Sequence, residues 1–179
     1  DLAVLAVESD ALPTQAVAEH VAERAGVPRS AVYLPAFATG SVTGSVVSAA
    51  RAAELAVFRL FELGYDPRDV LSVASSAPVA PASDTESTAL ARTTDALVYG
   101  SRVHLQVAAP FDRFDEVPST AAAEHGTPLA AAFDGVDWRF EDLSPALFGP
   151  AQVTVDVRGG GAETHGARDD AVLAESFAG

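Results

Sequence analysis

The longest periodic pattern in the chain covers about residues 45–63 and has the spacing of a helix. Apolar side chains such as Val47 and Phe58 fall on one side of a helix with this spacing. A stretch of small residues (GSVTGS, residues 40–45) leads into the pattern, and Gly64 closes it. The pattern predicts one long central helix over about residues 45–63, around which the rest of the chain must pack.

Short apolar segments on both sides of this helix predict β-strands. Residues 2–7 and 31–37 are apolar, and Val17 and Val21 between them indicate a helix that Gly26 stops. Later in the chain we expect strands at 70–73, 102–107, 153–158 and 163–165, helices near 86–95 and at the carboxyl end, and short helices with turns over 110–149. This order predicts an α/β (α+β) fold with a mixed sheet and packed helices, and we treat residues 1–179 as one compact unit.

The chain is strongly acidic. All 11 basic residues are Arg, and with 25 acidic residues the formal net charge is −14. Such a surface repels phosphate backbones, which argues against nucleic-acid binding. It is typical of a halophile-like protein in a salt-rich cytoplasm, although a GC-rich genome also favours Arg. An acidic surface is expected from the residues Asp112, Asp115, Glu116, Asp134, Asp137, Glu141 and Asp142.

Three further observations concern compartment, metal binding and length. No apolar run reaches the roughly 18 residues that a membrane span needs, and no basic-then-apolar leader precedes a cleavage site, so we expect a soluble protein, located in the cytoplasm. Cys is absent and no His-x-x-x-His spacing occurs, so no metal site is predicted. The chain starts at Asp1 directly before an apolar segment and contains no Met, so we expect that an amino-terminal portion of the protein precedes these residues.

Two charged residues interrupt the apolar side of the predicted central helix. Arg51 and Glu54 recur with Val47, Phe58 and Phe61 at helical spacing, so all five share one face. An exposed i, i+3 ion pair would contribute only about 0.2–0.5 kcal/mol to helix stability. The apolar neighbours instead favour a partly buried pair, and such pairs are enriched in functional sites. Arg51 and Glu54 are therefore our candidate catalytic residues.

The segment around this pair resembles a known enzyme family. The sequence GSVVSAARAAE at residues 44–54 is similar to the stretch of methenyltetrahydromethanopterin cyclohydrolases in which Gly-Ser-Val leads to Ala-Arg-x-x-Glu. Other matching segments follow the family order: ES at 8–9, VAEHVA at 17–22, VYL at 32–34, LGYD at 63–66, APVAP at 77–81, RTTD at 92–95, YG at 99–100, FGPA at 148–151 and ESF at 175–177. Because these segments are collinear over the whole chain, it resembles the carboxy-terminal portion of a family member.

The resemblance implies a reaction and roles for the pair. Family members reversibly hydrolyse the methenyl bridge of a tetrahydropterin to the N5-formyl compound, without a metal or an organic cofactor, and the resemblance implies a homo-oligomer, expected to be a trimer. The bridge carbon is already electrophilic, so the chemistry needs a positioned water and a proton acceptor. Glu54 would orient and deprotonate this water, while Arg51 would hold Glu54 and polarise oxygen.

Other segments that match the family supply candidate substrate-binding residues. These are Ser75, Ser76, Arg92, Thr93 and Asp95. Ordinary loop and capping roles are an alternative for each of them. The chain also departs from the family pattern, with Val47 in place of Gln, Thr94 in place of Asn, and Ala91 and Ser101 in place of glycines.

Two alternatives to this function remain open from the sequence. The carrier could be tetrahydrofolate instead of tetrahydromethanopterin. The chain could also be a non-catalytic domain that binds a pterin or forms an assembly, if the amino-terminal portion carries part of the active site.

Overall fold

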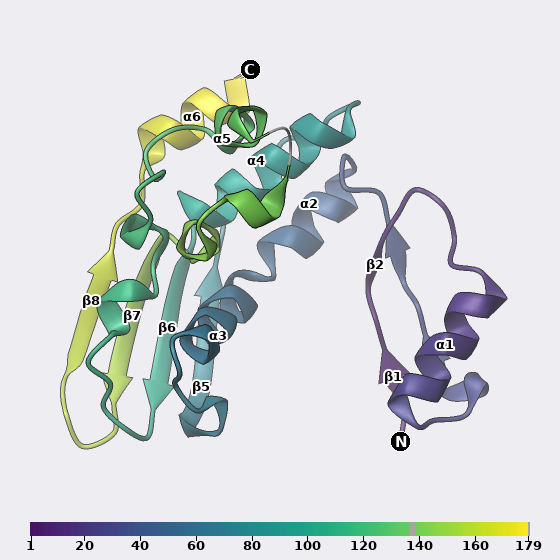
Figure 1. Ribbon diagram of the computed structural model, residues 1–179, viewed down its shortest axis with the longest axis horizontal. Helices are drawn as coiled ribbons and strands as arrows, with labels where there is room; N and C mark the ends of the chain where they lie inside the picture. The colour runs from purple at the N-terminus through teal and green to yellow at the C-terminus, as the bar shows by residue number, and fades with distance from the viewer. Residues whose placement is uncertain (137–138, 179) are drawn as a thin grey trace.

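The computed structural model describes residues 1–136 and 139–178, and its centre is a four-stranded sheet with strand order β5-β6-β7-β8. The strands are β5 (Val70–Ser76), β6 (Arg102–Val107), β7 (Gln152–Val157) and β8 (Ala162–Gly166). The pair β6 and β7 is parallel, and both edge strands run antiparallel to their neighbours. The predicted α/β fold with a mixed sheet is therefore confirmed (Figure 1).

One face of this sheet is covered and the other is open. Val103, Leu105 and Val107 of β6 are buried, while the side chains that alternate with them are exposed. In β7, Val153 and Val155 are buried on the same covered face. This alternation is that of a sheet packed on one side only.

Helix α3 (Ala52–Glu62) covers this face. Ala52, Ala56 and Leu60, spaced four residues apart, are fully buried against the strands. A second core lies where α4 (Glu86–Val98), α5 (Leu129–Gly135) and α6 (Asp170–Ala178) gather at one end of the sheet (Figure 1). Short 3₁₀ turns connect these parts at Pro67–Asp69, Phe114–Glu116, Ser119–Ala121, Phe140–Asp142 and Pro145–Phe148.

The first 37 residues form a smaller layer to one side of the main body (Figure 1). Two short parallel strand pairs are present here, β1 (Ala3–Val4) with β3 (Val32–Tyr33) and β2 (Val7–Glu8) with β4 (Ala36–Phe37). A 3₁₀ turn at Arg29–Ala31 leads into β3, and α1 (Gln15–Ala25) ends where Gly26 adopts the left-handed conformation, as predicted. Several large apolar side chains of this layer are exposed: Leu2, Val4, Leu5, Leu12, Val17 and Tyr33.

The predicted single helix over residues 45–63 is wrong, because the structure has two helices there. Helix α2 (Val42–Ala49) starts early because the Ser41 hydroxyl accepts a hydrogen bond from the Gly44 amide at 2.9 Å. The helix is interrupted at Ala50 and Arg51, where the Arg51 amide bonds to the Ser48 carbonyl at 3.0 Å, a 3₁₀-type contact. The local sequence consists of strong helix formers. The interruption follows from packing, since α2 lies on α4 while α3 lies on the sheet.

Other predicted boundaries change less. The strand expected at 70–73 continues to Ser76, so Ser75 and Ser76 belong to a strand and not to the following loop. The predicted strands at 2–7 and 31–37 are each divided into two short strands. No helix formed by the described residues combines the length and apolarity needed to cross a bilayer.

The close approach of Gly44 to the preceding segment gives a test of this fold. A Cβ atom at Gly44 would collide with the Ala38 carbonyl oxygen and lie 2.7 Å from that of Thr39. We expect Gly44→Ala to lower the free energy of unfolding by about 1–3 kcal/mol in urea titrations. Gly135→Ala is the matched control. It places the same methyl group in open space within α5 and should be neutral or slightly stabilising. Equal stability of the Gly44→Ala variant and the wild type would contradict this packing.

Candidate active site

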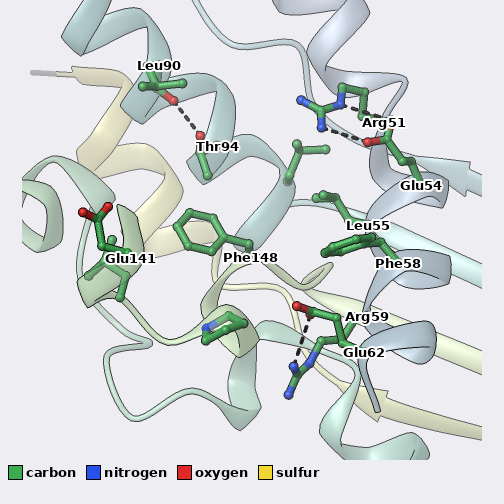
Figure 2. A pocket seen from close by; sticks show the side chains of 13 residues that line it. Arg51, Glu54, Leu55, Phe58, Arg59, Glu62, Leu90, Thr94, Glu141 and Phe148 are labelled. Carbon is green, nitrogen blue, oxygen red and sulfur yellow. Dashed lines mark hydrogen bonds and ion pairs between the residues drawn. The ribbon is translucent and has the colours of Figure 1, made fainter. Parts of the chain in front are cut away.

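A cavity of about 580 Å³ lies between α3, α4 and the segment around residues 141–148. Its walls are formed by Arg51, Glu54, Leu55, Phe58, Arg59, Glu62, Leu90, Thr94, Leu97, Glu141, Leu143, Pro145 and Phe148 (Figure 2). Apolar side chains make up most of the lining, and charged groups come mainly from α3. A concave apolar surface with a few polar groups is the usual form of a small-molecule site.

The predicted pair, Arg51 and Glu54, lies on this wall. Arg51 Nη2 donates to Glu54 Oε1 at 2.9 Å and Nε donates to Oε2 at 3.2 Å, so the contact is bidentate (Figure 2). The side chains are 48% and 60% exposed. The pair is thus more open to solvent than the apolar helical face suggested, and Phe61, predicted on the same face, does not line the cavity.

The interruption between α2 and α3 positions both charges. Arg51 precedes the first residue of α3, and Glu54 lies in its first turn. The free amide groups there favour a carboxylate. The hydrogen bond from Arg51 to Glu54 is the main cause that raises the Arg51 pKa, and the negative charges of Glu54 and of Glu8 raise it further. The Thr39 hydroxyl, buried at 6% exposure, donates to the Glu8 carboxylate.

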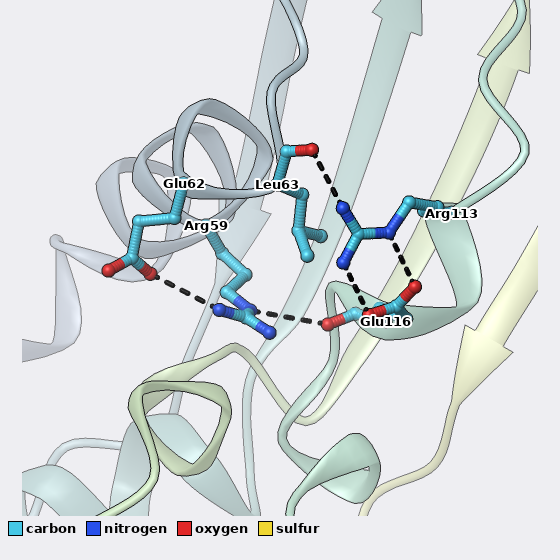
Figure 3. Close-up of polar contacts among 5 residues, drawn as sticks. All are labelled: Arg59, Glu62, Leu63, Arg113 and Glu116. Carbon is cyan, nitrogen blue, oxygen red and sulfur yellow. Dashed lines mark hydrogen bonds and ion pairs between the residues drawn. The ribbon is translucent and has the colours of Figure 1, made fainter.

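A second ion pair lines the same cavity and was not singled out from the sequence. Arg59 Nη1 lies 3.4 Å from Glu62 Oε2, and Arg59 Nε donates to the Glu116 carbonyl oxygen at 3.3 Å (Figure 3). The signal was available, because Arg59-x-x-Glu62 repeats the spacing of Arg51-x-x-Glu54 eight residues later on the same helix. The cavity therefore has one Arg–Glu pair near each end of α3.

The predicted substrate-binding residues Ser75, Ser76 and Arg92 lie away from this cavity. Ser75 and Ser76 are exposed in the edge strand β5. Arg92 lines a separate hollow of about 420 Å³ together with Gly40, and its Nε donates to the Ser176 carbonyl oxygen at 3.2 Å.

Thr93 and Asp95 are buried in α4 and also lie outside the cavity lining. The Thr93 hydroxyl donates to the Leu90 carbonyl oxygen. Asp95 accepts hydrogen bonds from the Leu129 amide at 3.0 Å and the Ser176 hydroxyl at 2.5 Å, so it joins α4 to α5 and α6. Thr94, noted only as a departure from the family pattern, lines the cavity.

Ser101, another departure from the family pattern, has a structural position. Its hydroxyl is fully buried, donates to the Leu97 carbonyl oxygen and accepts from the Ala151 amide. Within residues 1–136 and 139–178, no three His, Asp or Glu side chains are grouped as metal ligands. Asp137, part of the predicted acidic surface, lies outside the described residues.

An α/β fold with charged pairs on the wall of an apolar cavity is typical of a domain that binds a small organic molecule. The family model described as Cyclohydrolase (MCH) matches residues 1–177, and the chain belongs to this family. It is 54% identical over 177 residues to a methenyltetrahydromethanopterin cyclohydrolase of Halobacterium salinarum, a match that covers 99% of this chain and 57% of the relative.

More distant relatives carry the same name. Enzymes of Methanocella arvoryzae and Rhodopirellula baltica are each 35% identical, over 180 and 184 residues, with 99% of this chain and 57% and 55% of the relatives covered. The chain thus spans a little over half the length of these curated relatives. The resemblance inferred from collinear segments is confirmed.

Burial of Asp95 predicts a pH dependence of stability. Burial is the main cause that raises its pKa from 3.8 to about 6, against the opposing effect of its two hydrogen bonds. The folded chain holds the proton of the Asp95 carboxyl group more tightly than the unfolded chain. This proton binding therefore stabilises the fold, and the stabilisation is fully present below about pH 4. It is lost as the pH rises through 6, and amounts to at most about 3 kcal/mol.

Urea unfolding of the wild type and of Asp95→Asn between pH 4 and pH 7.5 measures this contribution. The Asn side chain keeps an acceptor for the Leu129 amide and does not titrate. We expect the variant to gain stability relative to the wild type as the pH rises from 4 to 7. Parallel pH profiles for the two proteins would show that Asp95 is not the responsible group.

Proposed function

We propose that this chain carries the catalytic pair of a cyclohydrolase that reversibly converts 5,10-methenyl-tetrahydromethanopterin to the N5-formyl compound. The observation that supports this proposal most directly is the bidentate contact of Arg51 with Glu54 on the wall of a largely apolar cavity. Membership of the family, together with the name that its relatives carry, supports the substrate class.

The proposed reaction begins with a water molecule next to Glu54. The Glu54 carboxylate accepts a proton as the water oxygen forms a bond to the cationic bridge carbon. The resulting tetrahedral adduct is neutral. Its bond from the bridge carbon to N10 then breaks, N10 takes up a proton, and the remaining hydroxyl loses its proton to become the formyl oxygen. One proton is released for each methenyl cation hydrolysed.

Arg51 has two proposed tasks in this sequence. Its two hydrogen bonds hold both Glu54 oxygens in one plane, which fixes the direction from which the carboxylate approaches water. Its positive charge also stabilises oxygen as the adduct forms. No metal or organic cofactor is proposed, because the bridge carbon is already an electrophile and needs no further activation.

The half-exposed pair also supports a proposal about partners. We propose that a further portion of a longer protein covers the open side of the cavity and the exposed apolar side chains of residues 1–37. The greater length of the relatives supports this arrangement. We also propose a homo-oligomer, expected to be a trimer, for which exposed apolar residues on the edge strand, Leu71 and Val73, provide contact surface.

The decay of the methenyl absorbance at neutral pH tests the catalytic role of Glu54. We expect Glu54→Gln to lower kcat by roughly 10²–10⁴-fold, because the amide is not a base. Glu19→Gln is the matched control. Glu19 likewise accepts a hydrogen bond from an arginine, Arg29, at 2.8 Å, but it lies on α1 outside the cavity. The Glu19→Gln variant should therefore hydrolyse the methenyl compound at the wild-type rate.

Two results would contradict the proposal in different ways. A wild-type chain no faster than buffer would favour the alternative of a non-catalytic pterin-binding or assembly domain. A Glu54→Gln chain as fast as the wild type would remove Glu54 from its role while leaving the reaction in place.

We further propose a halophile-like protein with an acidic surface that works in a salt-rich cytoplasm. The net charge of −14 supports this, as does the exposure of acidic residues between positions 112 and 142, among them Asp112, Asp115 and Glu141. Salt screens their mutual repulsion, with a Debye length of about 10 Å at 0.1 M and about 3 Å at 1 M.

Thermal unfolding at increasing KCl concentration tests this proposal. We expect the melting temperature to rise by several degrees between about 0.05 M and 1 M and then to level off, as screening does. A variant in which the exposed residues Asp10, Glu23 and Glu124 are replaced by their amides should show a smaller rise. A melting temperature that is independent of salt would count against the proposal.

A further inference from the structure

The second ion pair of the cavity, Arg59 and Glu62, lies farther along α3 than the proposed catalytic pair. Glu62 follows Glu54 by eight residues, which corresponds to about 12 Å along the helix axis. A bicyclic heterocycle with a hydrogen bond of about 3 Å at either end spans a similar length. A ligand that reacts beside Glu54 can therefore extend along α3 to reach Glu62.

The space between the two pairs suits a flat ring. Phe58 lies on the α3 wall and is 58% exposed, so part of its ring surface is accessible to a ligand in the cavity. Phe148 lies on the opposite wall (Figure 2), and its ring stacks with that of Phe133, with ring centroids 6.4 Å apart and planes at 20°. Aromatic side chains on two walls provide stacking surfaces for a planar heterocycle.

The second pair is held in place by a chain of hydrogen bonds. Arg59 Nε donates to the Glu116 carbonyl oxygen, and the Glu116 carboxylate accepts two hydrogen bonds from Arg113, at 2.6 and 2.8 Å (Figure 3). Arg113 in turn donates to the Leu63 carbonyl oxygen at the end of α3. The Arg59 side chain is only 14% exposed. The guanidinium is thus positioned before any ligand binds.

The same pair keeps unused hydrogen-bonding capacity toward a ligand. The contact of Arg59 Nη1 with Glu62 Oε2 is single and long, at 3.4 Å, whereas the Arg51–Glu54 contact uses both carboxylate oxygens. Among the described residues no partner is assigned to Glu62 Oε1 or to Arg59 Nη2. A purely structural i, i+3 pair would gain most from a short contact that uses both oxygens.

We propose that Arg59 and Glu62 recognise the 2-amino-4-oxo edge of the pterin ring. This edge presents an acceptor, the 4-oxo group, next to two donors, N3–H and the 2-amino group. A guanidinium beside a carboxylate offers the complementary order, one donor group followed by acceptors. Glu62 accepts from N3–H and the 2-amino group, Arg59 donates to the 4-oxo group, and Phe58 and Phe148 stack on the ring. The inference rests on the proposed function, from which the pterin is taken.

The cavity wall carries three carboxylates, Glu54, Glu62 and Glu141, and since Glu54 has the proposed catalytic role, Glu141 is the alternative acceptor for a ring edge. It lies across the cavity on a short 3₁₀ turn and is exposed (Figure 2). Among the described residues no arginine forms an ion pair with Glu141, whereas Glu62 lies 3.4 Å from Arg59 Nη1. Glu62 is therefore the favoured acceptor, and Glu141 becomes the matched control.

Equilibrium binding of two fluorescent ring compounds tests the proposal directly. Pterin carries the 2-amino group, while lumazine carries an oxo group at the same position and so replaces a donor with an acceptor. We expect the wild-type chain to bind pterin at least about tenfold more tightly than lumazine, because lumazine sets an acceptor against the Glu62 carboxylate. Glu62→Gln, which offers an amide donor, should reduce this ratio to within about twofold to threefold, while Glu141→Gln should keep it.

The outcomes separate this inference from the proposed function. Four results would each overturn the ring-recognition proposal. The wild-type chain could fail to bind pterin, or bind pterin and lumazine equally well. The affinity ratio of pterin to lumazine could also stay unchanged in Glu62→Gln, or be lost in Glu141→Gln. Melting temperatures of the variants show whether a changed ratio reflects unfolding. If the chain discriminates between the two rings through Glu62 but does not hydrolyse the methenyl compound, the ring site is supported and the cyclohydrolase proposal is contradicted. Hydrolysis with a ratio independent of Glu62 would do the reverse.

Discussion

The packing of α3 on the covered face of the sheet is the contact on which the site depends. Ala52, Ala56 and Leu60 form a buried stripe along one side of this helix, and the small alanine side chains let its backbone lie close to β5 and β6. Once this stripe is fixed, the rotation of the helix is fixed as well. Side chains on other sides of the helix, including Glu54 and Glu62, then line the cavity.

The interruption between α2 and α3 also determines where Arg51 and Glu54 lie. Arg51 lies where the 3₁₀-type turn ends one helix and the next begins, so its backbone follows neither axis. Glu54 gains the first-turn position, where unpaired amide groups favour a negative charge. A continuous helix would have placed the same two residues in its middle, without this electrostatic benefit. The site thus benefits from a break that helix propensity alone would not produce.

Buried polar groups connect the parts of the structure that frame the cavity. Asp95 ties α4 to α5 and α6, the Ser101 hydroxyl ties the end of α4 to the start of β7, and the Ser119 hydroxyl donates to the Val98 carbonyl oxygen. Each of these groups is fully buried and hydrogen-bonded, which limits alternative packing of the α4 region. Asp95 matches the family pattern and Ser101 departs from it. Both residues therefore influence the cavity indirectly, by fixing the elements that surround it.

The sequence by itself determined the α/β class, the approximate position of most elements, and the Arg51–Glu54 pair, because periodicity and collinear motifs are local properties of the chain. The tertiary structure alone decided that Ser75, Ser76, Arg92, Thr93 and Asp95 lie outside the cavity. It also decided that Thr94 and the pair of Arg59 and Glu62 lie on its wall. Neighbouring residues on a helix point in different directions, and only the packing of that helix against distant segments determines which direction faces solvent, core or ligand.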